Sequence, residues 1–353
     1  MNKNNNIIPF EEMKLDKERI LLAGGAGFIG HHLALELSQK GAEVIIADNL
    51  QVNNLVKIIT EQNISDLKRK LYINFILDRF SILRDKKISI STVDLRVLSD
   101  FAALHSEFEP TKIVHLAAIS SAVIANKVPN LAYDIQISSL RNLIELCRFK
   151  SSKVNQIVFM SSSTVYGDFK SDAVNETVRP NPKGVYANGK YIGERMVREA
   201  ESLYGIPYTI IRPSALYGIR CISGRVSQKF IENALMGIPL RLEGDGEGML
   251  DFTDVRDVVR GIVSAISLPG GTSNTFNITF GNAQKISKLV DIIQKHIPNV
   301  KIEHAPPAPE KPKRGTLKID RAIEYLGFKP KYPLDKGYDN YVKWYINEWE
   351  RLK

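Results

Sequence analysis

Short apolar runs alternate with longer amphipathic segments along most of the chain, beginning at residue 19. Apolar runs bounded by turn-forming residues predict buried strands, and they occur at 19–23, 43–47, 88–93, 112–116, 156–160 and 208–211. The segments between them predict helices at 28–40, 99–108, 130–149 and 187–204. Strands separated by helices are typical of an α/β protein with a doubly wound parallel sheet, and this is the fold class that we expect.

The same pattern divides the chain into three parts. Residues 1–18 contain little apolar sequence and are expected to form a flexible leader. Residues 19–218 carry the alternating pattern and form the sheet domain. After residue 218 the elements become shorter and glycine-rich turns appear. Residues 219–353 are therefore expected to be mainly a smaller, substrate-binding α/β lobe at the carboxyl edge of the sheet, with some segments returning to the sheet domain.

Residues 51–87 are longer than a simple connection between two strands. They contain two amphipathic segments, 54–64 and 67–83, which predict two helices in an insertion whose role the sequence does not reveal. A final helix is expected near 335–349.

Composition and charge narrow the classes of function. The contents of 44% hydrophobic and 25% charged residues are ordinary for a globular enzyme. No apolar run approaches the roughly 20 residues that span a membrane, and no signal-peptide core is visible, so we expect a cytoplasmic protein that binds no membrane. The net charge of +9 is dispersed, which favours an anionic small substrate over RNA or other nucleic acid. Neither Cys147 nor Cys221 has metal-ligand spacing, and no metal is expected.

Three glycines follow the first predicted strand at regular spacing, Gly24, Gly27 and Gly30. In a dinucleotide-binding loop the first glycine makes a tight turn, the second lets a pyrophosphate approach, and the third lets the helix pack on its strand. Asp48 lies 18 residues after Gly30, at the end of the second strand, near the place where an acidic residue binds the adenosine ribose. The sequence therefore predicts a dinucleotide site at the N-terminus of the helix over 28–40.

A second group of residues has catalytic chemistry. Tyr186 and Lys190 lie four residues apart and share one helical face, where a lysine ammonium can favour a phenolate that acts as a general base. About 24 residues upstream, a hydroxyl-rich run that includes Ser161, Ser162 and Ser163 ends an apolar strand. The run places an alcohol at the rim of the predicted sheet, beside the dinucleotide.

In this order the motifs resemble the extended short-chain dehydrogenase/reductase family, in its branch of NAD-dependent nucleotide-sugar epimerases and dehydratases. The resemblance runs from about residue 19 to residue 344, apart from the insertion, and implies a Rossmann-type fold. Besides the motifs above, it rests on the segments 93–95, 115–118, 212–218, 244–247, 251–255 and 314–315.

The resemblance implies NAD as the cofactor. Asp48 and Asn49 would bind the adenosine ribose, Asp94 and Leu95 would flank the adenine, and Lys190 would bind the nicotinamide ribose and tune Tyr186. The complete set of residues expected at NAD is Gly24, Gly27, Phe28, Ile29, Gly30, Asp48, Asn49, Asp94, Leu95, Ala117, Ala118, Tyr186, Lys190 and Pro213.

The resemblance also assigns the reaction and the substrate contacts. Tyr186 would take the proton from a sugar hydroxyl, usually at C4, and Ser162 would hydrogen-bond the reacting oxygen. Because the arginine fork suits a diphosphate, arginines are expected on the substrate; the substrate-binding set is Ser162, Ser163, Thr164, Arg220, Arg225 and Arg314. For Arg220 and Arg225 a plain surface role remains open.

Several positions depart from the family pattern. The 4,6-dehydratases follow their Ser/Thr with an Asp-Glu pair, whereas this chain has Ser163 and Thr164, which argues against dehydration. Ala215 replaces a usual asparagine and Leu250 replaces a usual arginine, and both of these usual residues contact the nucleotide diphosphate. A smaller change is Gln136, before Asn142 in the helix predicted over 130–149, which replaces an asparagine of the family. The grip on the diphosphate is therefore expected to differ from that of UDP-hexose enzymes.

The resulting hypothesis is NAD-dependent oxidation at C4 of a nucleotide-diphosphate sugar linked to GDP, UDP, dTDP or CDP. The chain would be a C4-epimerase or a 4-keto-forming dehydrogenase for bacterial surface polysaccharide. Segments 211–218, 250–253 and 313–317 together are similar to those of bacterial enzymes that oxidise GDP-heptoses. A nucleotide-sugar 4,6-dehydratase or decarboxylase and a non-catalytic NAD-binding scaffold are the alternatives. A homodimer is expected, with apolar residues of the helices over 130–149 and 187–204 either at its interface or packed on the sheet.

Overall fold

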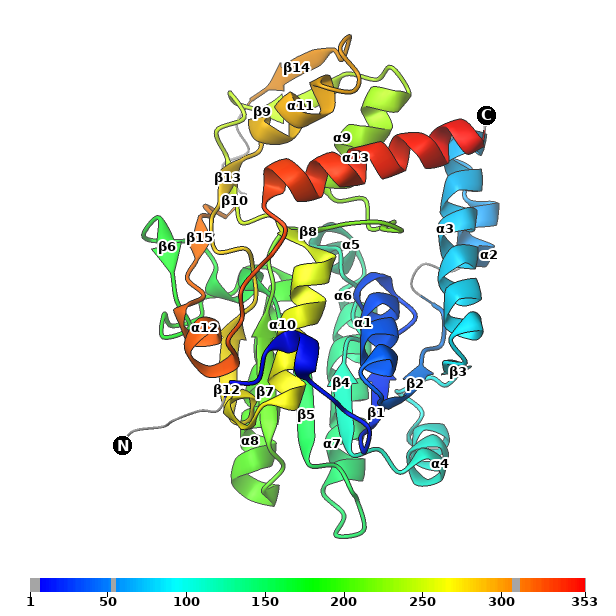
Figure 1. The fold of residues 1–353 in the computed structure, drawn as a ribbon, viewed down its shortest axis with the longest axis vertical. Coiled ribbons are helices and arrows are strands. Elements are labelled where there is room, and N and C mark those ends of the chain that lie inside the picture. Colours follow the sequence, from blue (N-terminus) through cyan, green and yellow to red (C-terminus); the bar gives the residue numbers. More distant parts are fainter. Residues whose placement is uncertain (1–6, 52–54, 307–311, 353) are drawn as a thin grey trace.

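The computed structural model describes residues 7–51, 55–306 and 312–352. Its centre is a seven-stranded sheet in the order β12-β7-β5-β4-β1-β2-β3 (Figure 1), and each neighbouring pair of strands is parallel. The strands are β1 (Arg19–Ala23), β2 (Glu43–Ala47), β3 (Ser89–Ser91), β4 (Lys112–His115), β5 (Gln156–Met160), β7 (Tyr208–Arg212) and β12 (Asn274–Asn277). The order reverses between β1 and β4, as in a doubly wound fold, so the predicted fold class is confirmed.

Helices cover both faces of the sheet, which explains why the central strands are apolar on both sides. On one face α1 (Phe28–Gln39) packs beside α10 (Val255–Ser267). On the other face lie α4 (Leu98–Phe108), α7 (Ser139–Cys147) and α8 (Val185–Tyr204). Two separate hydrophobic clusters, one on each face, form the core of the sheet domain.

The second lobe stands above the carboxyl edge of the sheet (Figure 1). It contains α9 (Val226–Leu235), α11 (Ser287–Gln294), α13 (Leu334–Arg351) and the parallel pair of β9 (Leu240–Glu243) and β14 (Ile302–Ala305). Three elements from this half of the sequence return to the sheet domain: α10, the edge strand β12, and α12 (Asp320–Leu326), which packs on both of them.

Shorter elements connect these parts. The remaining helices and strands are α5 (Ala122–Lys127), α6 (Pro129–Tyr133), β6 (Ala173–Val174), β8 (Leu216–Tyr217), β10 (Met249–Leu250), β11 (Thr253–Asp254), β13 (Gln284–Lys285), β15 (Thr316–Leu317) and 3₁₀ turns at Phe10–Glu12, Ser163–Tyr166 and Pro269–Gly271. Within the described ranges, no helix is both long and apolar enough to cross a membrane.

The insertion forms two helices, α2 (Leu55–Thr60) and α3 (Asp66–Asp85), at the edge of the molecule beside β3 (Figure 1). The predicted helix 54–64 begins among residues 52–54, which lie outside the described part of the chain. Ser65 caps α3, because its hydroxyl accepts a hydrogen bond from the Lys68 amide.

Residues 7–18 differ from the expected flexible leader, since they pack against the sheet domain. Met13 and Leu15 are buried in the main core. The Leu15 amide donates to the Lys40 carbonyl at 2.8 Å, and Lys40 Nζ donates to the Phe10 carbonyl at 2.6 Å. Phe10 also packs against this core, so apolar side chains within a polar segment hold it on the sheet domain.

The helix expected over 130–149 is interrupted by a π-helical turn at Asp134–Ser138, between α6 and α7. This turn places Gln136 against α8, where a Cβ added to Gly189 would lie 2.4 Å from Gln136 Oε1. Such turns occur frequently at functional sites. Farther along, Leu140 and Leu143 of α7 are fully buried under the sheet, so they follow the packing alternative and not the interface alternative.

Candidate active site

Two adjoining cavities lie at the carboxyl edge of the sheet, next to the point where the strand order reverses. The glycine-loop cavity measures about 980 Å³ and borders the ends of β1 and β4. The tyrosine cavity measures about 1200 Å³ and borders the ends of β5 and β7. Both are lined by Ile29, Leu116, Ala118, Ser120 and Arg225. The two cavities therefore form one continuous cleft at the place where open α/β sheets bind ligands.

Each glycine of the first loop is required for a different local reason. Gly24 has φ +78°, and a Cβ there would lie 2.6 Å from the Ala117 Cα. A Cβ on Gly30 would lie 2.2 Å from the Gly25 carbonyl oxygen. Over Gly27, in contrast, the nearest atom to an added Cβ is 3.9 Å away. Since no side chain caps the N-terminus of α1, its first amides and the open space at Gly27 fit a pyrophosphate.

The contrast between two of these glycines gives a paired prediction. We expect Gly30→Ala to lower the free energy of unfolding by about 1–3 kcal/mol, as overpacking does, because the new methyl group meets backbone. We expect Gly27→Ala to fold normally but to lose about 1.5–3 kcal/mol of NAD binding, the range for a hydrogen bond to a charged group. Thermal melts and calorimetric titration with NAD measure both effects. Equal NAD affinity of Gly27→Ala and wild type would contradict the assignment.

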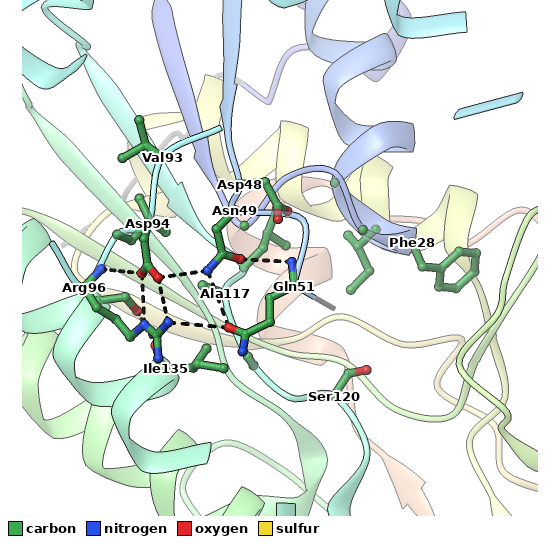
Figure 2. Close-up of a pocket in the computed structure, with 18 of the residues that line it drawn as sticks. Phe28, Asp48, Asn49, Gln51, Val93, Asp94, Arg96, Ala117, Ser120 and Ile135 are labelled. Atoms are coloured by element: carbon green, nitrogen blue, oxygen red, sulfur yellow. Dashed lines mark hydrogen bonds and ion pairs between the residues drawn. The ribbon is translucent and has the colours of Figure 1, made fainter. Parts of the chain in front are cut away.

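The far end of the glycine-loop cavity is polar. Asp48 accepts hydrogen bonds from the amides of Ala26 at 2.9 Å and Leu50 at 2.8 Å, which fixes its carboxylate beside the glycine loop. Figure 2 shows Asp94 enclosed by Arg96 and Asn49. Arg96 Nη2 lies 2.6 Å from Asp94 Oδ2 and Asn49 Nδ2 lies 3.0 Å from the same oxygen. Hydrogen bonds from Arg96 lower the pKa of Asp94 to about 2, so a carboxylate is held at this end.

The sequence prediction missed Arg96, Gln51 and Ser223, which also line the glycine-loop cavity. Arg96 directly follows Asp94 and Leu95, so its place next to a predicted adenine contact was the available signal. Gln51 and Ser223 lie in loops without a motif, and nothing in their local sequence distinguishes them.

The residues predicted to be catalytic come together on the tyrosine cavity. Tyr186 and Lys190 occupy the first turns of α8, and Ser162 follows the end of β5. Helix α8 approaches β5 closely because a Cβ on Gly193 would lie 2.2 Å from Phe159 Cζ. Lys190 Nζ donates to the Met160 carbonyl at 2.7 Å and is 6.0 Å from the centre of the Tyr186 ring. The predicted Ser/Tyr/Lys group therefore shares one wall of the cleft.

The electrostatics of Tyr186 differ from the sequence prediction, which gave Lys190 the role of lowering its pKa. Burial raises the pKa of Tyr186, and the charge of Arg225 and a hydrogen bond with Ser162 oppose this rise. The Lys190 ammonium is bound to the Met160 carbonyl, and burial lowers its own pKa to about 7. Arg225, which lines both cavities, is thus a cation whose charge lowers the pKa of Tyr186 against the effect of burial.

The lowered pKa of Lys190 predicts a dependence of stability on pH. Burial lowers this pKa from 10.5 to about 7, so between these values the unfolded chain binds a proton that the folded protein has released. Stability attributable to Lys190 therefore rises with pH in this window. In cofactor-free protein we expect the free energy of unfolding of wild type, minus that of Lys190→Met, to rise by up to about 1.4 kcal/mol per pH unit. Urea denaturation at several pH values measures it, and a flat difference would contradict it.

A buried ion pair holds α8 against the strands that carry the other residues of the tyrosine cavity. Arg212, at the end of β7, donates to both oxygens of Glu194 on α8, at 2.8 and 2.6 Å. Ser161 Oγ donates to Glu194 Oε1 at 2.6 Å. Because Glu194 is four residues after Lys190 and Ser161 precedes Ser162, this network fixes α8 relative to the ends of β5 and β7. It therefore sets the separation of Tyr186 and Ser162.

The outer part of the tyrosine cavity carries the positions expected to contact the substrate. Ser163, Thr164 and Pro213 line it, as do Ala215 and Leu250. Ala215 has φ +37°, a left-handed conformation that asparagine tolerates better than alanine. The backbone therefore keeps the shape suited to the usual asparagine although the side chain is lost.

The three candidate arginines separate in the structure. Arg225 and Arg314 line the tyrosine cavity, and Arg314 Nη1 also donates to the Gly167 carbonyl at 2.7 Å. Arg220 is not among the lining residues of either cavity. It has φ +61° and its Nε donates to His31 Nε2 at 3.1 Å, so its side chain turns toward α1. The other residues proposed for NAD and substrate all border the cleft.

Comparisons with known proteins agree with this geometry. The model of the NAD dependent epimerase/dehydratase family matches residues 20–279. A putative UDP-glucose 4-epimerase of Methanocaldococcus jannaschii is 30% identical over 335 residues, which cover 93% of this chain and 98% of the relative. UDP-glucuronate 4-epimerase 1 of Arabidopsis thaliana is 28% identical over 349 residues, with 93% of this chain and 76% of the relative covered.

A solved structure gives the same result. The UDP-glucose 4-epimerase of Thermotoga maritima, crystallised with UDP-glucose, is 26% identical and superposes with a TM-score of 0.79, covering 93% of this chain and 98% of that one. The family model, the relatives and the fold confirm the resemblance found in the sequence. The chain belongs to the NAD-dependent epimerase/dehydratase family.

Proposed function

We propose that this protein uses NAD to oxidise C4 of a nucleotide-diphosphate sugar, either as a C4-epimerase or as a dehydrogenase that releases the 4-keto product. The observation that carries the proposal is the convergence of Ser162, Tyr186 and Lys190 on one cavity that is continuous with the glycine-loop cavity. A general base and an alcohol donor beside a dinucleotide site suit the removal of a hydroxyl proton.

Each residue has a distinct task in this proposal. Tyr186 takes the proton of the C4 hydroxyl, and Ser162 hydrogen-bonds the same oxygen as it becomes a carbonyl. Lys190 binds the nicotinamide ribose. When bound, NAD supplies the hydride acceptor. Gly24, Gly27 and the N-terminus of α1 hold the pyrophosphate.

The proposal covers several nucleotide bases and sugars. Arg225 and Arg314 are proposed to bind the diphosphate, because both line the tyrosine cavity and the arginine fork matches phosphate oxygens. The relatives named above support a UDP-sugar, while Ala215 and Leu250 favour an altered grip. GDP-, dTDP- and CDP-sugars therefore stay within the proposal, together with a role in bacterial surface polysaccharide.

Dehydration is less well supported by the site. Elimination of water across C5 and C6 needs an acid and a base, which the 4,6-dehydratases supply as an Asp-Glu pair. In the described part of the chain, no Asp or Glu lines the tyrosine cavity, and Ser163 and Thr164 occupy the two positions in question. Hydroxyl groups cannot replace carboxyl groups in this elimination.

A substrate panel tests the proposal. Purified protein is incubated with NAD and UDP-, dTDP-, CDP- and GDP-linked sugars, and NADH absorbance and sugar products are followed by mass spectrometry and NMR. We expect either a C4-inverted sugar without net NADH or a 4-keto sugar with NADH. The absence of any new product and of NADH across the panel would overturn the proposal.

We further propose a homodimer that uses the outer face of α8. On this helix Ile192 is 39% exposed, so its apolar side chain is available to a partner subunit. Light scattering at two protein concentrations measures the mass, and a monomer at both would contradict the proposal.

A further inference from the structure

The inserted helix α3 connects the sheet domain to the second lobe. In Figure 1 it runs from the region of β3 to the C-terminal end of α13. Phe75, in the middle of α3, packs against Trp344 and Tyr345 of α13 with ring centres 4.8 and 5.6 Å apart. Leu71 and Leu83 of the same helix are buried in the main core. The insertion is thus part of the packed structure.

One polar contact of α3 fixes the start of a loop at the active site. Residues 219–225, here called the 219–225 loop, connect β8 to α9. Arg79 of α3 is 1% exposed, and its Nη2 donates a hydrogen bond to the backbone carbonyl of Arg220. Because this guanidinium is buried away from water, losing the hydrogen bond to the carbonyl would leave a buried donor without a partner, which costs free energy.

A second set of contacts fixes the end of the same loop. Tyr72 of α3 donates to Glu232 Oε1 at 2.6 Å and accepts from Gln228 Nε2 at 2.9 Å. The other end of the Gln228 amide, Oε1, accepts from the Gly224 amide at 3.0 Å. Gln228 Nε2 also donates directly to Glu232 Oε1 at 2.7 Å. Tyr72 and Glu232 therefore orient Gln228 together, and Gln228 in turn holds the residue before Arg225.

Glu232, on which this second set of contacts converges, is held by several partners. Glu232 is fully buried, lies 2.5 Å from Lys68 Nζ of α3, and accepts a hydrogen bond from Tyr345 of α13 at 2.6 Å. A buried carboxylate with a cation and several donors is fixed in place, because loss of any partner leaves charge unsatisfied. The end of the 219–225 loop is consequently tied to both α3 and α13.

The residue that these contacts place is Arg225. It is the N-cap residue of α9 and lines both the glycine-loop cavity and the tyrosine cavity. Arg225 and Tyr186 line the same tyrosine cavity, and the positive charge of Arg225 opposes the rise that burial causes in the pKa of Tyr186. A long, half-buried side chain between two ligand sites needs a fixed backbone to present its charge in one direction.

We propose that α3 is a positioning element of the active site, which holds the 219–225 loop at both ends so that Arg225 stands between the cofactor and the sugar. Tyr72 and Arg79 are the positioning residues, and Arg225 is the residue through which they act. This inference rests on the proposed function, because that function gives Arg225 its ligand. It assigns to the insertion a role in catalysis that its sequence does not reveal.

The test uses the full-length protein and the variant Tyr72→Phe, which removes one hydroxyl and keeps the ring. We expect KM for the nucleotide sugar to rise about 2- to 10-fold, the equivalent of one neutral hydrogen bond. The groups that face Tyr186 are Arg225, Ser162 and Lys190, and a displaced Arg225 favours the phenolate less. The acid limb of the pH profile of kcat/KM should therefore move to higher pH, in the same direction as in Arg225→Met.

Two comparisons separate positioning from a general loss of stability. Phe75 lies on the same helix and packs against the rings of Trp344 and Tyr345 in α13, but its side chain makes no hydrogen bond to the loop. Phe75→Leu should therefore lower the melting temperature and leave KM and the pH profile unchanged. The double variant Tyr72→Phe/Arg225→Met should be no worse than Arg225→Met, since Tyr72 acts through Arg225. Additive losses in the double variant, or equal shifts in Phe75→Leu, would overturn the inference. Arg79→Lys, at the other end of the loop, replaces Tyr72→Phe if that variant does not fold.

The failure of this inference can be distinguished from the failure of the proposed function. If wild-type protein transforms no sugar of the panel, the function fails, and the positioning is tested by calorimetric titration of UDP and GDP in the presence of NAD. Weaker nucleotide binding in Tyr72→Phe but not in Phe75→Leu supports the positioning role. If wild type is active and Tyr72→Phe equals it in KM, pH profile and nucleotide affinity, α3 has no such role.

Discussion

Replacing Tyr186 with phenylalanine is expected to lower kcat by about 10²- to 10⁴-fold, the range for loss of a general acid–base group. The phenol lines the tyrosine cavity, and it interacts with Ser162 and Arg225, which both favour its ionised form. Phenylalanine keeps the ring and its packing but cannot accept a proton. The loss is measured by comparing kcat of the variant and of wild type at saturating NAD, with the sugar of the panel that wild type converts fastest.

The same variant should keep most of its NAD affinity, because the residues proposed for the adenosine and the pyrophosphate line the glycine-loop cavity and the substitution removes only one hydroxyl from the set expected at NAD. Tyr191→Phe is a matched control, since Tyr191 lies on the same helix and does not line either cavity. If Tyr186→Phe retains more than about a tenth of the wild-type kcat, Tyr186 is not the base that this range describes.

Removing the carboxylate of Glu194 is expected to destabilise the protein by about 3–5 kcal/mol, the cost of breaking a buried ion pair. Glu194 and Arg212 are 0% and 1% exposed. In Glu194→Ala the Arg212 guanidinium would lose both hydrogen bonds to Glu194, and Ser161 would lose its acceptor. Urea denaturation gives the change in the free energy of unfolding.

Glu199→Ala provides the comparison, because Glu199 is on the same helix but exposed, and surface substitutions usually change stability by less than about 0.5 kcal/mol. A loss in Glu194→Ala as small as in Glu199→Ala would mean that water or another group replaces the carboxylate. We also expect Glu194→Ala to lower activity at temperatures where it remains folded, since the network sets the spacing between α8 and β5.

The strands of the sheet could be predicted where burial on both faces made them continuously apolar. The run over residues 156–160 became β5 with the same bounds. The edge strand β12 was missed, because Asn-Thr-Phe-Asn reads as a polar turn, and its pairing with β7 comes from tertiary structure. Strand β3 is shorter than predicted for a related reason: it is paired on one side only and ends at Ser91.

The site was predictable to the extent that its residues belong to motifs fixed by local geometry. The glycine loop needs close backbone approach, and the spacing of Tyr186 and Lys190 is fixed by the helix. The sequence allowed Arg220 and Arg225 equally to bind the substrate or to lie on the surface. In the structure Arg220 turns toward His31, whereas Arg225 lines the cleft. Arg220 also has a left-handed backbone, and no residue pattern in the sequence predicts this conformation at an arginine.

The return of α10 and β12 to the sheet domain makes the two lobes inseparable. If the chain were cut after residue 218, β7 would become an exposed edge strand and α1 would lose the helix that packs beside it. Such an edge and apolar face promote aggregation. We therefore expect that the second lobe cannot be exchanged between relatives as a module, so that a change of ligand specificity would have to come from side chains and loops around a shared core.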